Sequence, residues 1–169
     1  MKLRIAVVVT FLLSVSAPAS PQARADSRAV ERAVFSVLDD FIAAFNHQDA
    51  KAEAANYQFP HYRLANGVMS VWDRPGAEVE SWMDGTYKTL RELGFDHSSW
   101  TRRKIIHLSD SKVHVDTEIT RYLKDGTVLA KLDSLYILTK ENGRWGIKMR
   151  SSFDQVIAAP GDSTRALHK

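Results

Sequence analysis

The chain of 169 residues contains no cysteine, so no disulfide bond can hold its fold together. Glycine and proline are also scarce, at 8 and 5 residues, while 44% of the residues are hydrophobic. These proportions exclude a collagen-like chain and a largely disordered one. We therefore expect one globular domain whose core is stabilised by packing alone.

A clustered positive charge is missing as well. The formal net charge of +3 comes from the first 25 residues, which hold Lys2, Arg4 and Arg24 and no acid. The remaining residues carry equal numbers of basic and acidic side chains, 20 of each. Nucleic acid binding needs a concentrated cationic surface that displaces counterions. We therefore expect no nucleic acid partner.

The most hydrophobic stretch, residues 5–15, has only 11 residues, whereas a membrane-spanning helix needs about 20. Basic residues precede it, and small residues with Ala-x-Ala sites at 17–19 and 23–25 follow. This is the three-part pattern of a secretory signal peptide. We predict that residues 1–25 are removed, that the protein is periplasmic or secreted, and that it has no membrane attachment after cleavage.

Apolar residues at helical spacing predict two long amphipathic helices, over residues 28–47 and 77–93. Asp26 or Ser27 is expected to cap the start of the first helix. Gly94 stands where a glycine commonly ends a helix, so it is expected to terminate the second.

A short alanine-rich helix is predicted between them, capped by Asp49 and ending near residue 57. A β-hairpin follows over residues 61–65 and 68–72, because an Asn-Gly pair between two β-prone runs is a strong turn signal. One face of this hairpin is apolar. The other face carries His61, Arg63 and Trp72. We expect this second face to lie in water, since polar residues are mostly exposed, with pocket lining as the alternative.

After Gly94 the hydrophobic period changes to two, which predicts strands over residues 95–108, 112–123, 127–140 and 145–153. Short turns make them antiparallel neighbours. In the last strand, alternation places Trp145, Ile147, Met149, Ser151 and Phe153 on one face. The domain is expected to span residues 26–153, followed by a flexible tail over 154–169.

This order of elements predicts an α+β fold, α-α-ββ-α-ββββ, with a curved antiparallel sheet wrapped around the N-terminal helices. Together with the segments Phe41–Asp49 and Gly143–Ile147, it resembles the nuclear transport factor 2-like, or SnoaL-like, superfamily over about residues 28–153. The resemblance implies a cone with an apolar pocket at its open end. It implies no single chemistry, because the superfamily includes isomerases, dehydratases, hydrolases and non-enzymatic binders.

Ketosteroid isomerase, a member of that superfamily, permits a residue-by-residue check. Its oxyanion-binding tyrosine corresponds to Phe41, which has no hydroxyl to donate. Its catalytic aspartate would fall near Ala65, and residues 62–66 contain no carboxylate. We therefore expect no isomerisation by that mechanism.

Several side chains are nevertheless candidates for a ligand pocket. They are His61, Arg63, Trp72, Trp82, Tyr87 and Arg121. His61 is a candidate general base near neutral pH, as is Asp133 if burial raises its pKa. The alternatives are structural: Arg121 reaching solvent, Trp82 and Tyr87 in the core, and Asp133 paired with Arg121 or Arg150.

No metal or cofactor is expected, because histidine pairs at ligand spacing and phosphate-binding glycine loops are absent from the sequence. The leading hypothesis is an exported domain that binds a small, largely apolar ligand in its cone without catalysis. One alternative is an enzyme of the same fold that uses His61 or Asp133. Another is a partner-binding module without a ligand. The resemblance also implies a two-fold homodimer through the outer sheet face, where Arg103 could meet Glu118 of the second copy.

Overall fold

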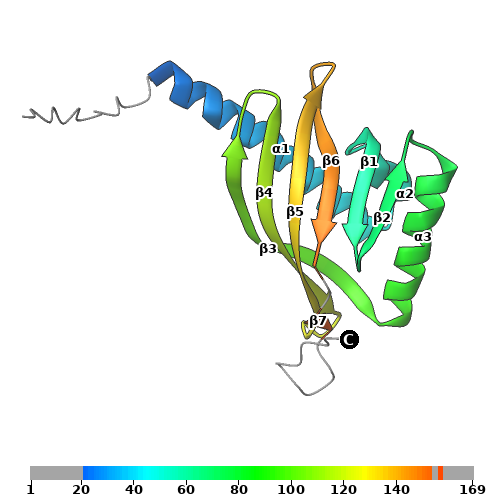
Figure 1. Ribbon diagram of the computed structural model, residues 1–169. Coiled ribbons are helices and arrows are strands. Elements are labelled where there is room, and N and C mark those ends of the chain that lie inside the picture. The colour runs from blue at the N-terminus through cyan, green and yellow to red at the C-terminus, as the bar shows by residue number, and fades with distance from the viewer. Residues whose placement is uncertain (1–20, 154–155, 158–169) are drawn as a thin grey trace, which may run out of the picture.

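One curved sheet wraps around the first helix in the computed structural model, which describes residues 21–153 and 156–157 (Figure 1). The helices are α1 (Pro21–His47), α2 (Ala50–Ala54) and α3 (Ala77–Glu92). The strands are β1 (Tyr57–Ala65), β2 (Val68–Trp72), β3 (Phe95–Leu108), β4 (Lys112–Leu123), β5 (Val128–Glu141), β6 (Arg144–Ser152) and β7 (Val156–Ile157). Helix α1 crosses one face of the sheet, while α2 and α3 lie at its β1–β2 end (Figure 1).

The strands are ordered β2-β1-β6-β5-β4-β3. Strands β1 and β6 are parallel, and the other neighbours in this order are antiparallel. The parallel pair arises because the chain leaves the β1–β2 hairpin through α3 and returns along the meander β3 to β6. The predicted α+β class, with a curved sheet around N-terminal helices, is confirmed.

The predicted bounds of the meander strands are close to those observed. Strands β3 and β4 have the predicted ends, and β5 and β6 each begin and end one residue away. The predicted flexible tail lies outside the described residues except for β7, whose Val156 and Ile157 pair with Lys131 and Ala130 of β5. The sequence pattern did not reveal this two-residue strand.

Helix α1 begins earlier than predicted. It starts at Pro21, and proline suits a first helical position because its missing N–H would have no partner there. Asp26 and Ser27 therefore lie inside the helix, and the prediction that one of them caps it is wrong. The predicted signal segment up to residue 20 lies outside the described residues.

The start of α2 and the end of α3 agree with the sequence prediction. The Asp49 side chain accepts a 2.9 Å hydrogen bond from the Ala52 N–H at the start of α2. This helix ends at Ala54, earlier than predicted, since Tyr57 already begins β1. Helix α3 ends at Glu92, and Gly94 follows with φ of +78°, a conformation that glycine adopts without steric cost.

The β1–β2 hairpin has the predicted register but the opposite orientation. His61 pairs with Trp72 and Arg63 with Ser70, as the Asn66-Gly67 turn requires. However, His61 and Trp72 are buried, whereas Met69 and Val71 are about half exposed. The expectation that the polar face lies in water is wrong, because Trp82 of α3 packs against Trp72 with ring centroids 5.0 Å apart.

The core fills the space between α1 and the concave face of the sheet. Helix α1 contributes Val34, Leu38 and Phe41, which are essentially inaccessible to solvent. Trp145 of β6 is 8% exposed and belongs to the same hydrophobic cluster. With no disulfide bond, this packing has to stabilise the domain.

Replacing Trp145 with alanine should lower the free energy of unfolding by about 3–5 kcal/mol, as removal of a large buried ring does. Urea unfolding of both proteins measures the difference. Phe153→Ala is the matched control, because Phe153 is 69% exposed, and should cost less than about 1 kcal/mol. Equal losses in the two variants would contradict the assigned core.

Candidate ligand pocket

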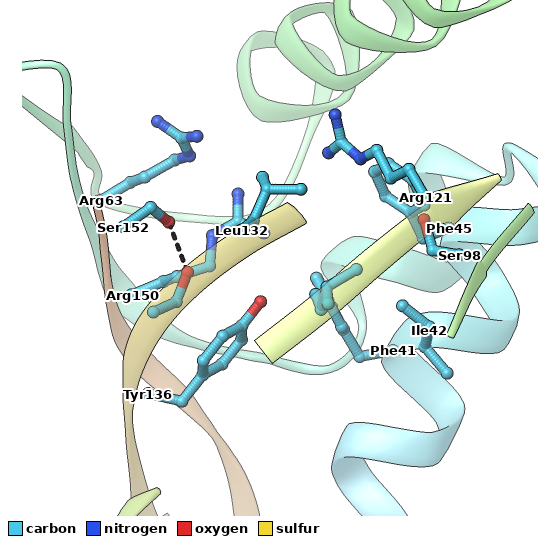
Figure 2. Close-up of a pocket in the computed structure, with 12 residues that line it drawn as sticks. Phe41, Ile42, Phe45, Arg63, Ser98, Arg121, Leu132, Tyr136, Arg150 and Ser152 are labelled. Carbon is cyan, nitrogen blue, oxygen red and sulfur yellow. Dashed lines mark hydrogen bonds between the residues drawn. The ribbon is translucent and has the colours of Figure 1, made fainter. Parts of the chain in front are cut away.

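A pocket opens between α1 and the concave face of the sheet (Figure 2). Its walls come from α1 and from strands β1, β3, β4, β5 and β6. The lining residues are Phe41, Ile42, Phe45, Arg63, Ser98, Ile119, Arg121, Leu132, Ser134, Tyr136, Arg150 and Ser152. Counted together with its open mouth, the hollow measures about 350 Å³, but the centre of a water molecule fits in only about 20 Å³ of it. That space suits a group the size of a carboxylate rather than a whole steroid.

Three arginines from three strands point into this pocket. Arg63 of β1 and Arg150 of β6 are direct neighbours across the parallel pair. Arg121 of β4 continues the inward-facing row that contains Ile119. Figure 2 shows Arg63 and Arg121 on opposite sides of the pocket with Arg150 between them.

Arg150 reaches the pocket because of an irregularity in β6. Leu138 of β5 pairs with Ile147, but the preceding Ile137 pairs with Met149, so Lys148 is an extra residue in β6. This bulge shifts the alternation, and Arg150, opposite Tyr136, takes the inward position that the sequence assigned to Met149. The prediction that Met149 shares a face with Ile147 is therefore wrong, and sequence reasoning missed Arg150 as a pocket residue.

Aromatic rings, rather than carboxylates, support the three guanidinium groups. Arg63 lies 5.0 Å from the ring centre of Trp82, Arg121 lies 5.2 Å from that of Phe45, and Arg150 lies 5.6 Å from that of Phe41. Among the side chains that the structure describes, none of the three forms an ion pair. Cation–π contacts of this kind hold a cation without using its N–H donors.

The donors of these arginines are incompletely used. The Nε atom of each is buried and has no hydrogen-bond partner among the described residues. Burial, together with the charge of Arg150, lowers the pKa of Arg63 and of Arg121 to about 10, so both stay charged at neutral pH. Buried charge without a partner is costly, and an anion in the pocket would offset that cost.

The sequence reasoning also missed Glu53, a buried acid on α2. Its carboxylate accepts hydrogen bonds from the hydroxyls of Tyr57, at 2.9 Å, and Tyr87. Burial raises the pKa of Glu53, although the positive charge of Arg150 opposes this change. The sequence did offer one indication of this buried acid, which is a lone acidic residue within the alanine-rich segment after Asp49. Tyr87, a predicted pocket residue, is thus a partner of Glu53 and does not line the pocket.

His61 belongs to the core beside the pocket rather than to its lining. Its ring stacks on Tyr57 with centroids 3.7 Å apart, and its Nδ1 lies 2.9 Å from the Ile147 carbonyl oxygen, to which it donates. Burial lowers the pKa of His61 to about 3. A histidine with this pKa is neutral near pH 7 but a very weak base, which disfavours its predicted role as a general base.

Asp133 lies on the outer face of the sheet, away from the pocket. It pairs with Arg102, which also binds Asp116 at 3.0 Å. The candidate role of Asp133 as a buried base is therefore wrong, and so is its predicted pairing with Arg121 or Arg150. Alternation along β5 places Leu132 and Ser134 inward and Asp133 outward.

The two charges expected to meet across a dimer lie on opposite faces of the sheet. Arg103 is the register partner of the buried Thr117 and forms an ion pair with Asp39 of α1, so its predicted place on the outer face is wrong. Glu118 lies on the outer face, 3.6 Å from Arg102. The two charges that were expected to meet across a dimer thus already have partners. A homodimer through this face stays a prediction.

The remaining candidate residues support the pocket indirectly. Trp72 is buried in the core, and Trp82 packs against both Trp72 and Arg63. Among the described residues, no group of three histidine, aspartate or glutamate side chains could hold a metal ion. No helix in that part of the chain is long and apolar enough to cross a membrane.

A family model described as NTF2-like protein (DUF6841) matches residues 31–151. The chain belongs to this family. No curated protein matches it. The match confirms the nuclear transport factor 2-like resemblance, and it covers α1 from Glu31 onward through nearly all of β6.

Solved structures share the fold of this NTF2-like chain. An NTF2-like protein with a cystatin-like fold from Novosphingobium aromaticivorans has a TM-score of 0.65 and 12% identity, covering 78% of this chain and 86% of that one. A protein of unknown function from Nostoc punctiforme has a TM-score of 0.60 and 12% identity, covering 79% and 93%. A ketosteroid isomerase-like protein from Erwinia carotovora atroseptica has a TM-score of 0.54 and 18% identity, covering 76% of this chain and 96% of that one. At these identities the likeness shows the fold alone.

The lowered pKa of His61 makes stability depend on pH. The unfolded chain takes up a proton on this ring below about pH 6.5, whereas the folded protein does not until about pH 3. The free energy of unfolding should therefore fall by up to about 1.4 kcal/mol per pH unit as the pH falls through that window. His61→Gln, compared with wild type by urea unfolding from pH 7 to pH 4, should show a flatter dependence. Parallel curves would contradict a buried neutral His61.

Proposed function

We propose that this NTF2-like domain binds a small molecule through an anionic group, in the pocket between α1 and the sheet. The observation that carries the proposal is the set of three guanidinium groups, Arg63, Arg121 and Arg150, whose buried Nε atoms lack acceptors. Arginine presents a planar fork of donors that matches a carboxylate, and the resulting charge-assisted hydrogen bonds are strong.

The rest of the lining suits an apolar body attached to that anionic group. Phe41, Ile42 and Phe45 form the α1 wall, and Ile119 and Leu132 lie on the sheet. Because the enclosed space is small, the anionic end would lie deep while the apolar part extends toward the mouth. The expectation of a largely apolar ligand thus becomes a proposal for an amphipathic one.

Binding is better supported than proton transfer. Apart from the three arginines, Tyr136 is the one titratable group among the lining residues, and burial raises its pKa. His61 and Asp133 lie elsewhere. A carboxylate or imidazole positioned to accept a proton from a ligand is therefore missing from the described lining, and we propose no reaction.

Hexanoate should bind to the purified domain and 1-hexanol should not, because the two differ chiefly in the charged group. Calorimetric titration at pH 7 in low-chloride buffer measures both. Arg63→Met, which keeps an unbranched side chain against Trp82, should weaken hexanoate binding at least tenfold, since charge-assisted hydrogen bonds are lost. Arg150→Met provides a second variant if the first fails to fold.

Arg102→Gln is the matched control, because it removes a cation from the outer face and should leave hexanoate affinity unchanged. Thermal unfolding without ligand adds an independent measurement. A binding role predicts that Arg63→Met unfolds at the wild-type temperature or above it, because an unpaired half-buried charge has been removed. Binding of hexanol as tight as that of hexanoate, or full binding by Arg63→Met, would reject the proposal.

We also propose that the ligand is bound outside the cytoplasm, on the signal-peptide pattern of residues 1–25. Cleavage before Asp26 would remove the first five residues of α1 and keep its apolar stripe, which begins at Val30. N-terminal sequencing of exported protein should give Asp26, or Ser20 if the earlier site is used. Exported protein that begins at Met1 would contradict cleavage.

A further inference from the structure

We infer that the ligand of the proposed binding function is a dianion with two separated charges, such as a short dicarboxylate. This inference rests on the proposed function and specifies its ligand class. It comes from the arrangement of the pocket's donors into two groups on different strands.

The first group lies where β1 meets β6. Arg63 and Arg150 are direct partners across this parallel pair, so their Cα atoms are about 4.8 Å apart. Tyr136 of β5 is the antiparallel partner of Arg150, and its hydroxyl points into the pocket (Figure 2). One carboxylate can accept hydrogen bonds from both guanidinium groups at this end.

The second group lies on the opposite side of the pocket. Arg121 of β4 is the direct partner of Ser98 of β3, and the buried Ser98 hydroxyl has no hydrogen-bond partner among the described residues. Asn46 of α1 holds Ser98 in place by hydrogen bonds of 2.8 and 2.9 Å to its backbone N–H and carbonyl oxygen. This end therefore presents a rigid hydroxyl beside a cation.

Arg150 and Arg121 lie two strands apart, about 10 Å across the sheet. Their partners on β5, Tyr136 and Ala130, are six residues apart, which adds about 20 Å along the strands. Both side chains nevertheless line the same pocket, from different sides of it (Figure 2). A ligand with carboxylates at its two ends can contact both groups at once. Phosphate or sulfate, which concentrates its charge on one centre, suits only one group.

The charge balance inside the cone also favours a ligand with two negative charges. Three guanidinium groups meet a single buried carboxylate among the described residues, that of Glu53, whose negative charge acts on all of them. The two tyrosine hydroxyls on Glu53 hold it on α2, outside the lining. At least two positive charges thus remain uncompensated, and a ligand with two negative charges neutralises them.

The test compares succinate with butyrate, which has the same four carbons and one carboxylate. Calorimetric titration at pH 7 should give succinate an affinity about 10- to 100-fold higher, with one molecule bound per chain, because a second set of charge-assisted hydrogen bonds forms. Arg121→Met should reduce the succinate-to-butyrate ratio to near one. Arg102→Gln, on the outer face, should leave the ratio at its wild-type value.

The outcomes separate this inference from the function on which it rests. Equal affinities of succinate and butyrate for wild type would overturn the dianion while leaving the anion-binding function intact. Binding of two butyrate molecules per chain would also overturn it, since two independent sites would then exist. If Arg121→Met keeps the wild-type ratio of succinate to butyrate affinity, Arg121 does not contact the second carboxylate, and the two-group arrangement is overturned. If hexanoate, butyrate and succinate all fail to bind, the proposed function itself is rejected.

Discussion

The cation–π contacts inside the cone are the interactions on which the pocket depends. Each inward arginine rests on an aromatic ring from a helix: Trp82 of α3 for Arg63, Phe45 of α1 for Arg121 and Phe41 of α1 for Arg150. The helices therefore position the charges that the strands supply. Because rings use no N–H donors, the guanidinium groups keep their hydrogen-bonding capacity for a ligand.

A second polar cluster lies behind the pocket, and most of its polar atoms have hydrogen-bond partners within the protein. The hydroxyls of Tyr57 and Tyr87 donate hydrogen bonds to Glu53, and His61 stacks against Tyr57 and donates to the Ile147 carbonyl oxygen. A buried network of this kind is stabilising when its members have partners. Within this cluster only the Nε2 atom of His61 lacks a partner among the described residues, whereas all three inward arginines have an unpaired Nε atom.

Much of the fold could be predicted from the sequence because local signals were strong. Period-two alternation located β3 and β4 at their observed ends, and the Asn66-Gly67 turn established the hairpin register. Asp49 and Gly94 marked the helix ends where they were expected. Within the site, Arg63 and Arg121 were named as pocket candidates, and both line the pocket. These features depend on side chains close together in the chain.

The sequence by itself determined the elements, their order and the family, since periodicity and turn residues act locally. Only the tertiary structure decided which side of each element faces inward at the pocket. Packing of Trp82 on Trp72 turned the polar hairpin face into the interior, and the extra residue Lys148 in β6 moved Arg150 into the lining. Burial keeps His61 neutral in the core, while Asp133 forms an ion pair with Arg102 on the outer face of the sheet. These outcomes depend on contacts between residues far apart in sequence, which local patterns do not encode.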